Sequence, residues 1–139
     1  MKIEEIEKEI ISEFEIFDDW LDRYNYLIEM GKSLPVIDAK NKTEINLIHG
    51  CQSRVWLHAD FFDGHIHFTA DSDAVITRGI ISLLIRALSD RTPDEIISAR
   101  LEFIDAIGLT QHLSPSRSNG LTSMIKQIKL YALAFKAKE

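Results

Sequence analysis

Apolar residues in the first part of the chain recur three or four positions apart, first at Ile3, Ile6, Ile10 and Phe14 and then at Leu21, Tyr24 and Ile28. This spacing places them on one face of a helix, so the pattern predicts two amphipathic helices. Asp18 is expected to cap the second helix. Gly31 and Pro35 are expected to end it, because glycine accepts a left-handed cap and proline cannot continue the hydrogen-bond ladder.

From Val55 onward the apolar period changes to two, which predicts a β-strand over residues 55–62. Asp63-Gly64 follows, a strong signal for a type I′ hairpin turn, since both turn positions need positive φ. A turn at this point aligns the apolar faces of two strands through the pairs Leu57–Ala70, Ala59–Phe68 and Phe61–Ile66. Residues 45–48 are expected to add a third strand, because an isolated two-stranded ribbon is only marginally stable in water.

Residues 74–88 are apolar almost all the way round, as expected for a helix buried against a sheet. Gly79 lowers helix propensity by about 1 kcal/mol relative to alanine, so it is interpreted as a point of close backbone approach. Thr92-Pro93-Asp94-Glu95 is a capping box that starts a short helix. A long C-terminal helix is expected from Leu121 onward, after a loop over residues 113–120.

The order of these elements is helices, then a small antiparallel sheet of about three strands, then helices. This order predicts an α+β fold in which the sheet packs against a layer of helices that includes the N- and C-terminal ones. The chain has 139 residues, of which 45% are hydrophobic. This size and balance predict a single domain over residues 1–139.

The formal net charge of −6 makes nucleic acid and anionic membranes improbable partners. The longest apolar run, residues 79–85, lies between Arg78 and Arg86 and is far shorter than the ~20 residues of a membrane span. Glu4 and Glu5 stand where a secretory signal would be apolar. A cytosolic protein without a membrane anchor is therefore expected.

Cys51 is the one cysteine of the sequence, so it cannot form an internal disulfide or supply the thiolates of a structural metal site. The adjacent Gly50 removes a side chain beside the thiol. His49 and Arg54 are candidate positive charges that would favour the thiolate form. A lone cysteine is also commonly a small buried hydrophobe, and that interpretation stays open.

The five histidines do not show the tight spacing of converging ligands, so no metal site is predicted. Asp71-Ser72-Asp73 precedes the predicted buried helix and is interpreted first as its N-cap region, where carboxylates accept hydrogen bonds from free backbone N–H groups.

Three segments together resemble the signature blocks of the SufE family of sulfur-acceptor proteins: residues 50–56 (GCQSRVW), residues 71–79 (DSDA leading to Gly79) and residues 109–121 (LTQHLSPSRSNGL). They occur in the family's order. The resemblance implies an α+β protein that takes sulfane sulfur from a pyridoxal-phosphate cysteine desulfurase of the SufS or CsdA type, stimulates that enzyme, and passes the sulfur on to a scaffold for iron–sulfur cluster assembly.

The resemblance also assigns roles to residues. It places the acceptor thiol at Cys51 and puts Arg117 near the desulfurase interface, with Gln52, Ser53, Arg54, Asp71 and Asp73 as further binding candidates. Arg117 could activate the thiolate or dock the partner, and the sequence does not separate these roles. No cofactor is expected, because the desulfurase's pyridoxal phosphate breaks the C–S bond, and no independent turnover is expected either. Monomer and homodimer both remain open.

Alternatives to a sulfur carrier use the same residues. A one-cysteine thiol peroxidase or redox sensor would direct the nucleophile at peroxide oxygen. A non-catalytic adaptor would use Cys51 only to fill the core, and a cluster-building scaffold is disfavoured because a cluster needs several thiolates. For a carrier, we expect Cys51 to pack against apolar side chains in the free protein and to move before it reacts with a partner.

Overall fold

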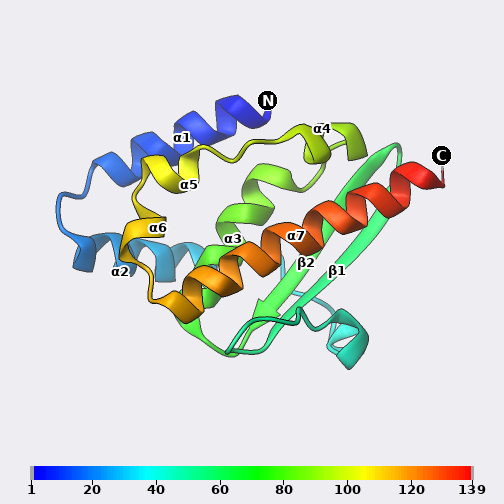
Figure 1. The fold of residues 1–139 in the computed structure, drawn as a ribbon, viewed down its shortest axis with the longest axis horizontal. Helices are drawn as coiled ribbons and strands as arrows, with labels where there is room; N and C mark the ends of the chain where they lie inside the picture. Colours follow the sequence, from blue (N-terminus) through cyan, green and yellow to red (C-terminus); the bar gives the residue numbers. More distant parts are fainter. Residues whose placement is uncertain (1, 139) are drawn as a thin grey trace.

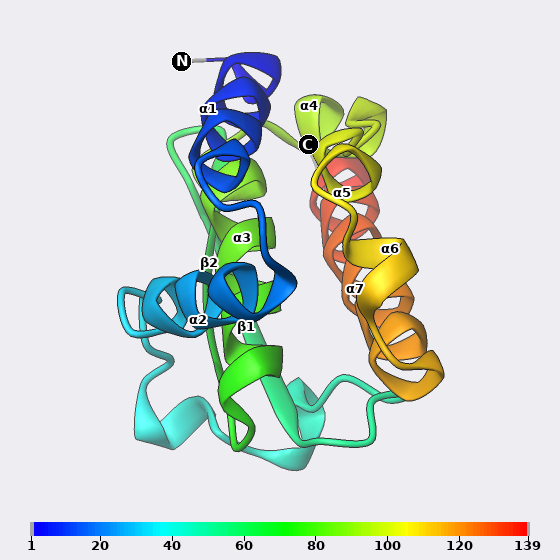
Figure 2. The same cartoon turned by 90° about the vertical axis from the view of Figure 1, so that its left-hand side faces the viewer.

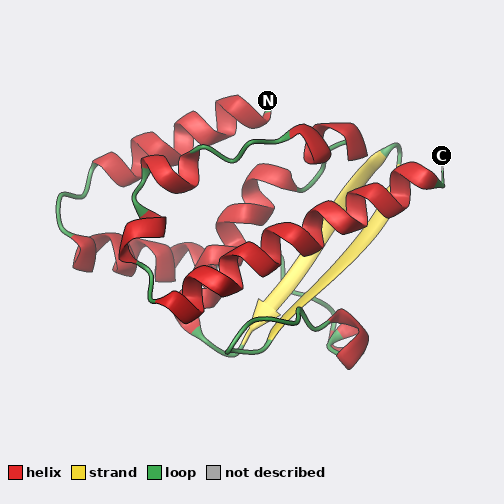
Figure 3. Ribbon diagram, viewed as in Figure 1, coloured by secondary structure: helices red, strands yellow, loops and turns green. Residues whose placement is uncertain are grey.

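The computed structural model of the protein describes residues 2–138 and confirms the α+β class (Figures 1 and 3). Its elements in chain order are α1 (Ile3–Glu15), α2 (Trp20–Gly31), the 3₁₀ helices η1 (Ala39–Asn41) and η2 (Glu44–Asn46), β1 (Val55–Phe62), β2 (His65–Ser72), α3 (Val75–Leu88), α4 (Pro93–Ser98), α5 (Phe103–Ala106), α6 (Leu109–His112) and α7 (Pro115–Ala137).

The hairpin has the predicted register. Leu57 pairs with Ala70, Ala59 with Phe68 and Phe61 with Ile66. At the turn, φ is 54° at Asp63 and 74° at Gly64, as a type I′ turn requires.

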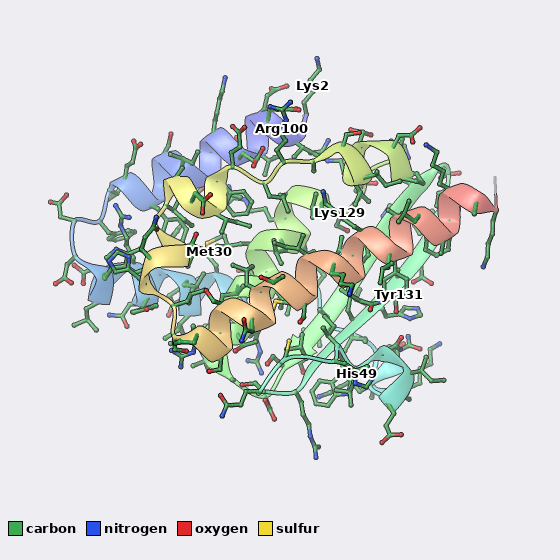
Figure 4. The ribbon with its side chains drawn as sticks, in the orientation of Figure 1. Lys2, Met30, His49, Arg100, Lys129 and Tyr131 are labelled. Atoms are coloured by element: carbon green, nitrogen blue, oxygen red, sulfur yellow. The ribbon has the colours of Figure 1, made fainter. Side chains whose placement is uncertain are left out.

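The predicted third strand is wrong. In the described residues the sheet has two strands, and the segment expected to be the third forms η2 and a single bridge from Leu47 to Trp56. The hairpin is stabilised by helices instead of a third strand, because its apolar face packs against α3 and the Tyr131 hydroxyl of α7 donates to the Leu57 carbonyl at 3.4 Å. Figure 4 shows Tyr131 between α7 and β1.

Helix α3 is the centre of the core, and most of its residues are buried. It contacts β2, α1, α2 and α7, and Figure 2 shows α7 on one side of it, with α1 and α2 towards the other. Each fully buried leucine or isoleucine contributes about 1.5–3 kcal/mol of transfer free energy. The apolar surface of this helix therefore contributes a large part of the burial that stabilises the fold.

Helices α2 and α3 meet at two glycines. A Cβ on Gly79 would clash with the Leu27 carbonyl, which confirms the predicted close backbone approach. Gly31 ends α2 as predicted, but for a different reason. It does not have positive φ, and a Cβ there would lie 3.0 Å from the Gly79 amide nitrogen. Gly31 therefore serves helix packing and not a left-handed cap.

The N-caps of three helices can be compared with their predictions, of which two are wrong and one is confirmed. Asp19, not Asp18, caps α2, and its Oδ1 accepts from the Leu21 N–H at 2.9 Å. The predicted carboxylate cap of α3 is wrong, because the N-cap is Ala74 and no side chain caps it. The capping box that begins α4 is confirmed, with Thr92 as the cap.

The C-terminal helix begins six residues earlier than predicted, at Pro115 instead of Leu121. Ser114 is its N-cap, and the Ser114 hydroxyl accepts from the Arg117 N–H at 3.4 Å. The segment interpreted as a loop is therefore the first turn and a half of α7. This correction places both Arg117 and Gly120 on a helix.

Candidate functional site

Cys51 lies on the loop between η2 and β1 and is half-buried. Its Sγ lies 3.6 Å from the Gly120 carbonyl oxygen of α7. A Cβ added at Gly120 would lie 3.4 Å from this Sγ. The thiol therefore packs against α7 at Gly120.

Gly50, next to the thiol, has φ of +94°, a conformation that side chains disfavour. A Cβ on Gly50 would also clash with the Ser123 hydroxyl of α7. Gly50 is thus required both for the turn of the backbone and for the closeness of the loop to α7.

The loop is tied to the protein on its other side, at Arg54. The Arg54 N–H donates to Asp73 Oδ1 at 3.1 Å, and the Asp73 N–H donates to the Arg54 carbonyl at 3.3 Å. The Ser72 hydroxyl donates to the same carbonyl at 2.8 Å. The backbone of Arg54, not its exposed side chain, makes these contacts, so Arg54 and Asp73 fix the end of the loop that leads into β1.

A cavity of about 360 Å³ opens beside the thiol. It brings together residues from the loop, from α3 and from the start of α7: Cys51, Gln52, Ser53, Thr77, Ile80, Ser114, Ser116, Arg117, Gly120 and Met124. Of the predicted site residues, the structure places Cys51, Gln52, Ser53 and Arg117 around one space. Arg54 and Asp73 are not among the lining residues and hydrogen-bond each other instead.

Asp71 does not line the cavity. It accepts from Lys42 Nζ and from Arg78 Nε, each at 3.1 Å, and Lys42 also lies 4.5 Å above the Trp56 ring. Burial opposes the charged form of Asp71, but the Ser72 N–H and the two cations outweigh it and lower the pKa of this carboxyl. Asp71 therefore holds the segment before the Cys51 loop against the hairpin.

The pKa of the Cys51 thiol differs from the expectation. Burial raises the pKa of the Cys51 thiol, so the predicted lowering by His49 and Arg54 is wrong. Figure 4 shows His49 at the loop end of the molecule, beside the short 3₁₀ helices. The packing of Cys51 against the edge of the apolar core is confirmed. In this conformation the thiol is protected and mostly protonated at neutral pH.

Sequence reasoning missed several cavity residues: Thr77, Ile80, Ser114, Ser116 and Met124. One signal would have found two of them. Ser114-Pro115 is a capping serine followed by proline, the same start signal that Thr92-Pro93 gives for α4. Thr77 and Ile80 carry no such signal, because their approach to Cys51 depends on how α3 packs.

Two features of the described residues bear on other classes of function. Between residues 2 and 138, no group of three or more His, Cys, Asp or Glu side chains is arranged to hold a metal ion. None of the helices in the same part of the chain combines the length and apolar character that a membrane span requires.

Comparison with known proteins identifies the family. Residues 8–132 match the family model for SufE, described as an Fe-S metabolism associated domain. The chain belongs to the SufE family. It is 42% identical over 126 residues to an uncharacterized SufE-like protein of Rhizobium meliloti, covering 87% of this chain and 90% of that one. The family assignment confirms the resemblance and connects the chain with iron–sulfur metabolism.

Other relatives extend the likeness. An uncharacterized SufE-like protein of Synechocystis is 37% identical over 126 residues, covering 91% of this chain and 79% of that one. SufE-like protein 1, chloroplastic/mitochondrial, of Arabidopsis thaliana is 39% identical over 133 residues, which are 94% of this chain but 36% of the plant protein. A hypothetical protein from Thermus thermophilus shares the fold, with a TM-score of 0.76 and 21% identity over 93% of this chain and 94% of that one.

Proposed function

We propose that this SufE-family protein is a sulfur carrier. Cys51 accepts sulfur from the persulfide of a pyridoxal-phosphate cysteine desulfurase of the SufS or CsdA type. The protein thereby stimulates that enzyme and passes the sulfur on to iron–sulfur cluster assembly. The observation that carries the proposal is the placement of the one cysteine on a loop beside a cavity that Arg117 also lines. We place this activity in the reducing cytosol, where a free thiol persists.

The transfer step is an exchange of one S–S bond for another. The Cys51 thiolate attacks the outer sulfur of the desulfurase persulfide. A bond forms between Cys51 Sγ and that sulfur, the S–S bond of the desulfurase breaks, and the desulfurase cysteine leaves as a thiolate. No oxidant or reductant is consumed, because the sulfane sulfur changes its partner and not its oxidation state.

A single thiol suits this chemistry. A second cysteine nearby would attack the loaded Cys51, release sulfide and leave a disulfide. The sequence contains no second cysteine.

The contacts of the loop suggest how the thiol reaches a partner. The loop is held by backbone hydrogen bonds at Arg54, whereas at Cys51 it is held by a long sulfur hydrogen bond and by packing against the edge of the core. Displacement of the Cys51 end from α7 would carry the thiol out of its half-buried position and into a partner's active site. The same displacement would remove the burial that raises the pKa of the thiol.

The raised pKa of Cys51 weighs against a thiol peroxidase. Cysteines that react rapidly with peroxide are usually accessible and have a lowered pKa. A carrier that is protonated until it docks agrees better with the observed environment.

Turnover of a cognate desulfurase tests the proposal directly. Wild-type protein is expected to raise the rate of sulfide or alanine formation and to gain the mass of one sulfur atom on Cys51. Cys51→Ser should do neither while keeping the fold. Equal stimulation by Cys51→Ser, or no added sulfur on the wild-type chain, would contradict a carrier role and favour an adaptor.

Arg117→Ala separates the two roles open to this side chain. Arg117 is exposed at the mouth of the cavity. If it docks the partner, its loss raises the protein concentration needed for half-maximal stimulation and leaves the alkylation rate of Cys51 unchanged. If it activates the thiolate, the alkylation rate falls as well.

A further inference from the structure

The cavity beside Cys51 is accessible to a small molecule without movement of the loop. Its volume of about 360 Å³ lies within the ~300–1,000 Å³ range of small-molecule sites. Cys51 is one of its walls, so a sulfur atom bound to Sγ is reachable from within the cavity. A partner protein, by contrast, requires the loop to swing out.

Thr77 offers a hydrogen-bonding group to this cavity. The residue is only 7% exposed and lines the cavity from α3. Among the described residues 2–138, its hydroxyl has no hydrogen-bond partner and is not one of the fully buried unpartnered polar atoms, so it is accessible from the cavity. It is therefore available to hydrogen-bond a polar group that binds there.

The opposite wall favours a negative charge. Ser114 is the N-cap of the 23-residue helix α7, and Ser116 and Arg117 lie in its first turn. Pro115 has no N–H and the Ser114 hydroxyl accepts from the Arg117 N–H, so the attraction for an anion comes from the helix dipole and from the Arg117 guanidinium. Arginine adds a planar donor that matches a carboxylate. The described residues of the lining include no acidic side chain.

The remaining walls suit the sulfur and carbon atoms of a thiol. Ile80 and Met124 are both 1% exposed and line the cavity near Cys51. Methionine is polarisable and packs well against irregular apolar groups. The cavity thus combines a nucleophile, an apolar wall, a free hydroxyl and a cationic mouth.

We propose that this cavity binds a low-molecular-weight thiol that carries a carboxylate, such as cysteine or a short cysteine-containing peptide, and that this thiol removes sulfur from persulfidated Cys51. The inference rests on the proposed function. The thiolate of the small molecule attacks the outer sulfur, a new S–S bond forms on the small molecule, and the Cys51 S–S bond breaks. Cys51 leaves as a thiolate, so the products are a small persulfide and the regenerated carrier.

Binding is tested without any sulfur transfer. S-methylglutathione, which cannot react, is titrated into the Cys51→Ser chain and followed by amide chemical shifts. We expect saturable shifts at Thr77, Ser116 and Arg117. Thr77→Val keeps the shape but removes the hydroxyl, and we expect it to weaken binding about fivefold, as for the loss of one hydrogen bond. Thr122→Val, on the exposed surface of α7, is the matched control and should bind normally.

Transfer is tested on the wild-type chain after persulfide loading and removal of the desulfurase and free cysteine. Glutathione should remove the added sulfur at a rate that saturates, whereas mercaptoethanol, which has no carboxylate, should act at a rate proportional to its concentration. Thr77→Val should raise the half-saturating glutathione concentration about fivefold and leave the mercaptoethanol rate unchanged.

The two experiments fail in different ways. Absence of binding by S-methylglutathione, or equal and unsaturable rates for both thiols, overturns the small-thiol site and leaves the carrier role intact. Failure of Cys51 to load from a desulfurase overturns the proposed function and with it the transfer step, whatever the binding experiment shows.

Discussion

Two places in this protein depend on glycine to bring segments close together, and they differ in what closes the contact. Where α2 meets α3, Gly31 and Gly79 let two helix backbones touch inside the core. Where the Cys51 loop meets α7, Gly50 lets the loop lie on the helix, and the Cys51 Sγ contacts the Gly120 carbonyl oxygen at 3.6 Å. The first contact is buried inside the core, whereas the second lies at the edge of the core beside a cavity.

The difference shows how one fold combines a rigid core with a movable thiol. Close packing makes the α2–α3 contact costly to disturb, because the surrounding atoms have no free space. The loop contact borders a cavity, so its atoms have space to move. The Cys51 thiol therefore lies beside free space and not inside the close-packed core.

The largest effect is expected from Gly79→Ala. Its Cβ would clash with the Leu27 carbonyl, and we expect a loss of about 3 kcal/mol in the free energy of unfolding, measured by urea denaturation. Gly120→Ala is the matched control, because its Cβ would make an ordinary contact at 3.4 Å. It should change stability by less than about 1 kcal/mol. Equal losses for both variants would contradict the comparison.

Ser123→Leu should open the loop contact while sparing the core. The larger side chain cannot fit below Gly50, so we expect the Cys51 end of the loop to be displaced and alkylation of Cys51 by a bulky maleimide to quicken about tenfold at constant pH. Thr122→Leu places the same side chain on the exposed face of α7 and serves as the control. An unchanged rate in Ser123→Leu would show that Ser123 does not hold the loop.

The pH dependence of Cys51 alkylation sharpens the same point. The thiolate is the reacting form, and burial raises the pKa of this thiol. The midpoint of the rate profile should therefore lie above the ~8.5 of free cysteine and should fall toward that value in Ser123→Leu. A wild-type midpoint below that of free cysteine would contradict the half-buried position of the thiol.

The smallest effect is expected at Asp71, which ties the Lys42 segment to the hairpin. Because the folded protein lowers the pKa of this carboxyl, its contribution to stability is present above the unfolded pKa and is lost as pH falls through the folded pKa. Asp71→Asn should cost about 1 kcal/mol at pH 7. Urea denaturation should show this difference shrinking as the pH is lowered below 4, and a constant difference would count against the ion pairs.

Much of the fold follows from local patterns. The alternation of residues 55–62 and the Asp63-Gly64 turn set the hairpin register, since side chains of a strand alternate strictly between two faces. The apolar run of residues 74–88 identifies the buried helix. The prediction of a third strand was wrong because β propensity is a weak determinant where tertiary contacts already stabilise a hairpin. The start of α7 was missed because serine, asparagine and glycine favour loops only on average.

The features of the candidate site can also be separated into those that the sequence predicts and those that depend on tertiary packing. By itself, the sequence determined the family, the single thiol and its association with Gln52, Ser53 and Arg117, because these depend on residue identity and order. Only the tertiary structure decided that Arg54 makes its contacts through its backbone, that Asp71 belongs to another contact and that Thr77 lines the cavity beside the thiol. The pKa of Cys51 belongs to this second group. A pKa depends on burial and on distances between segments far apart in the chain, and no local pattern encodes those.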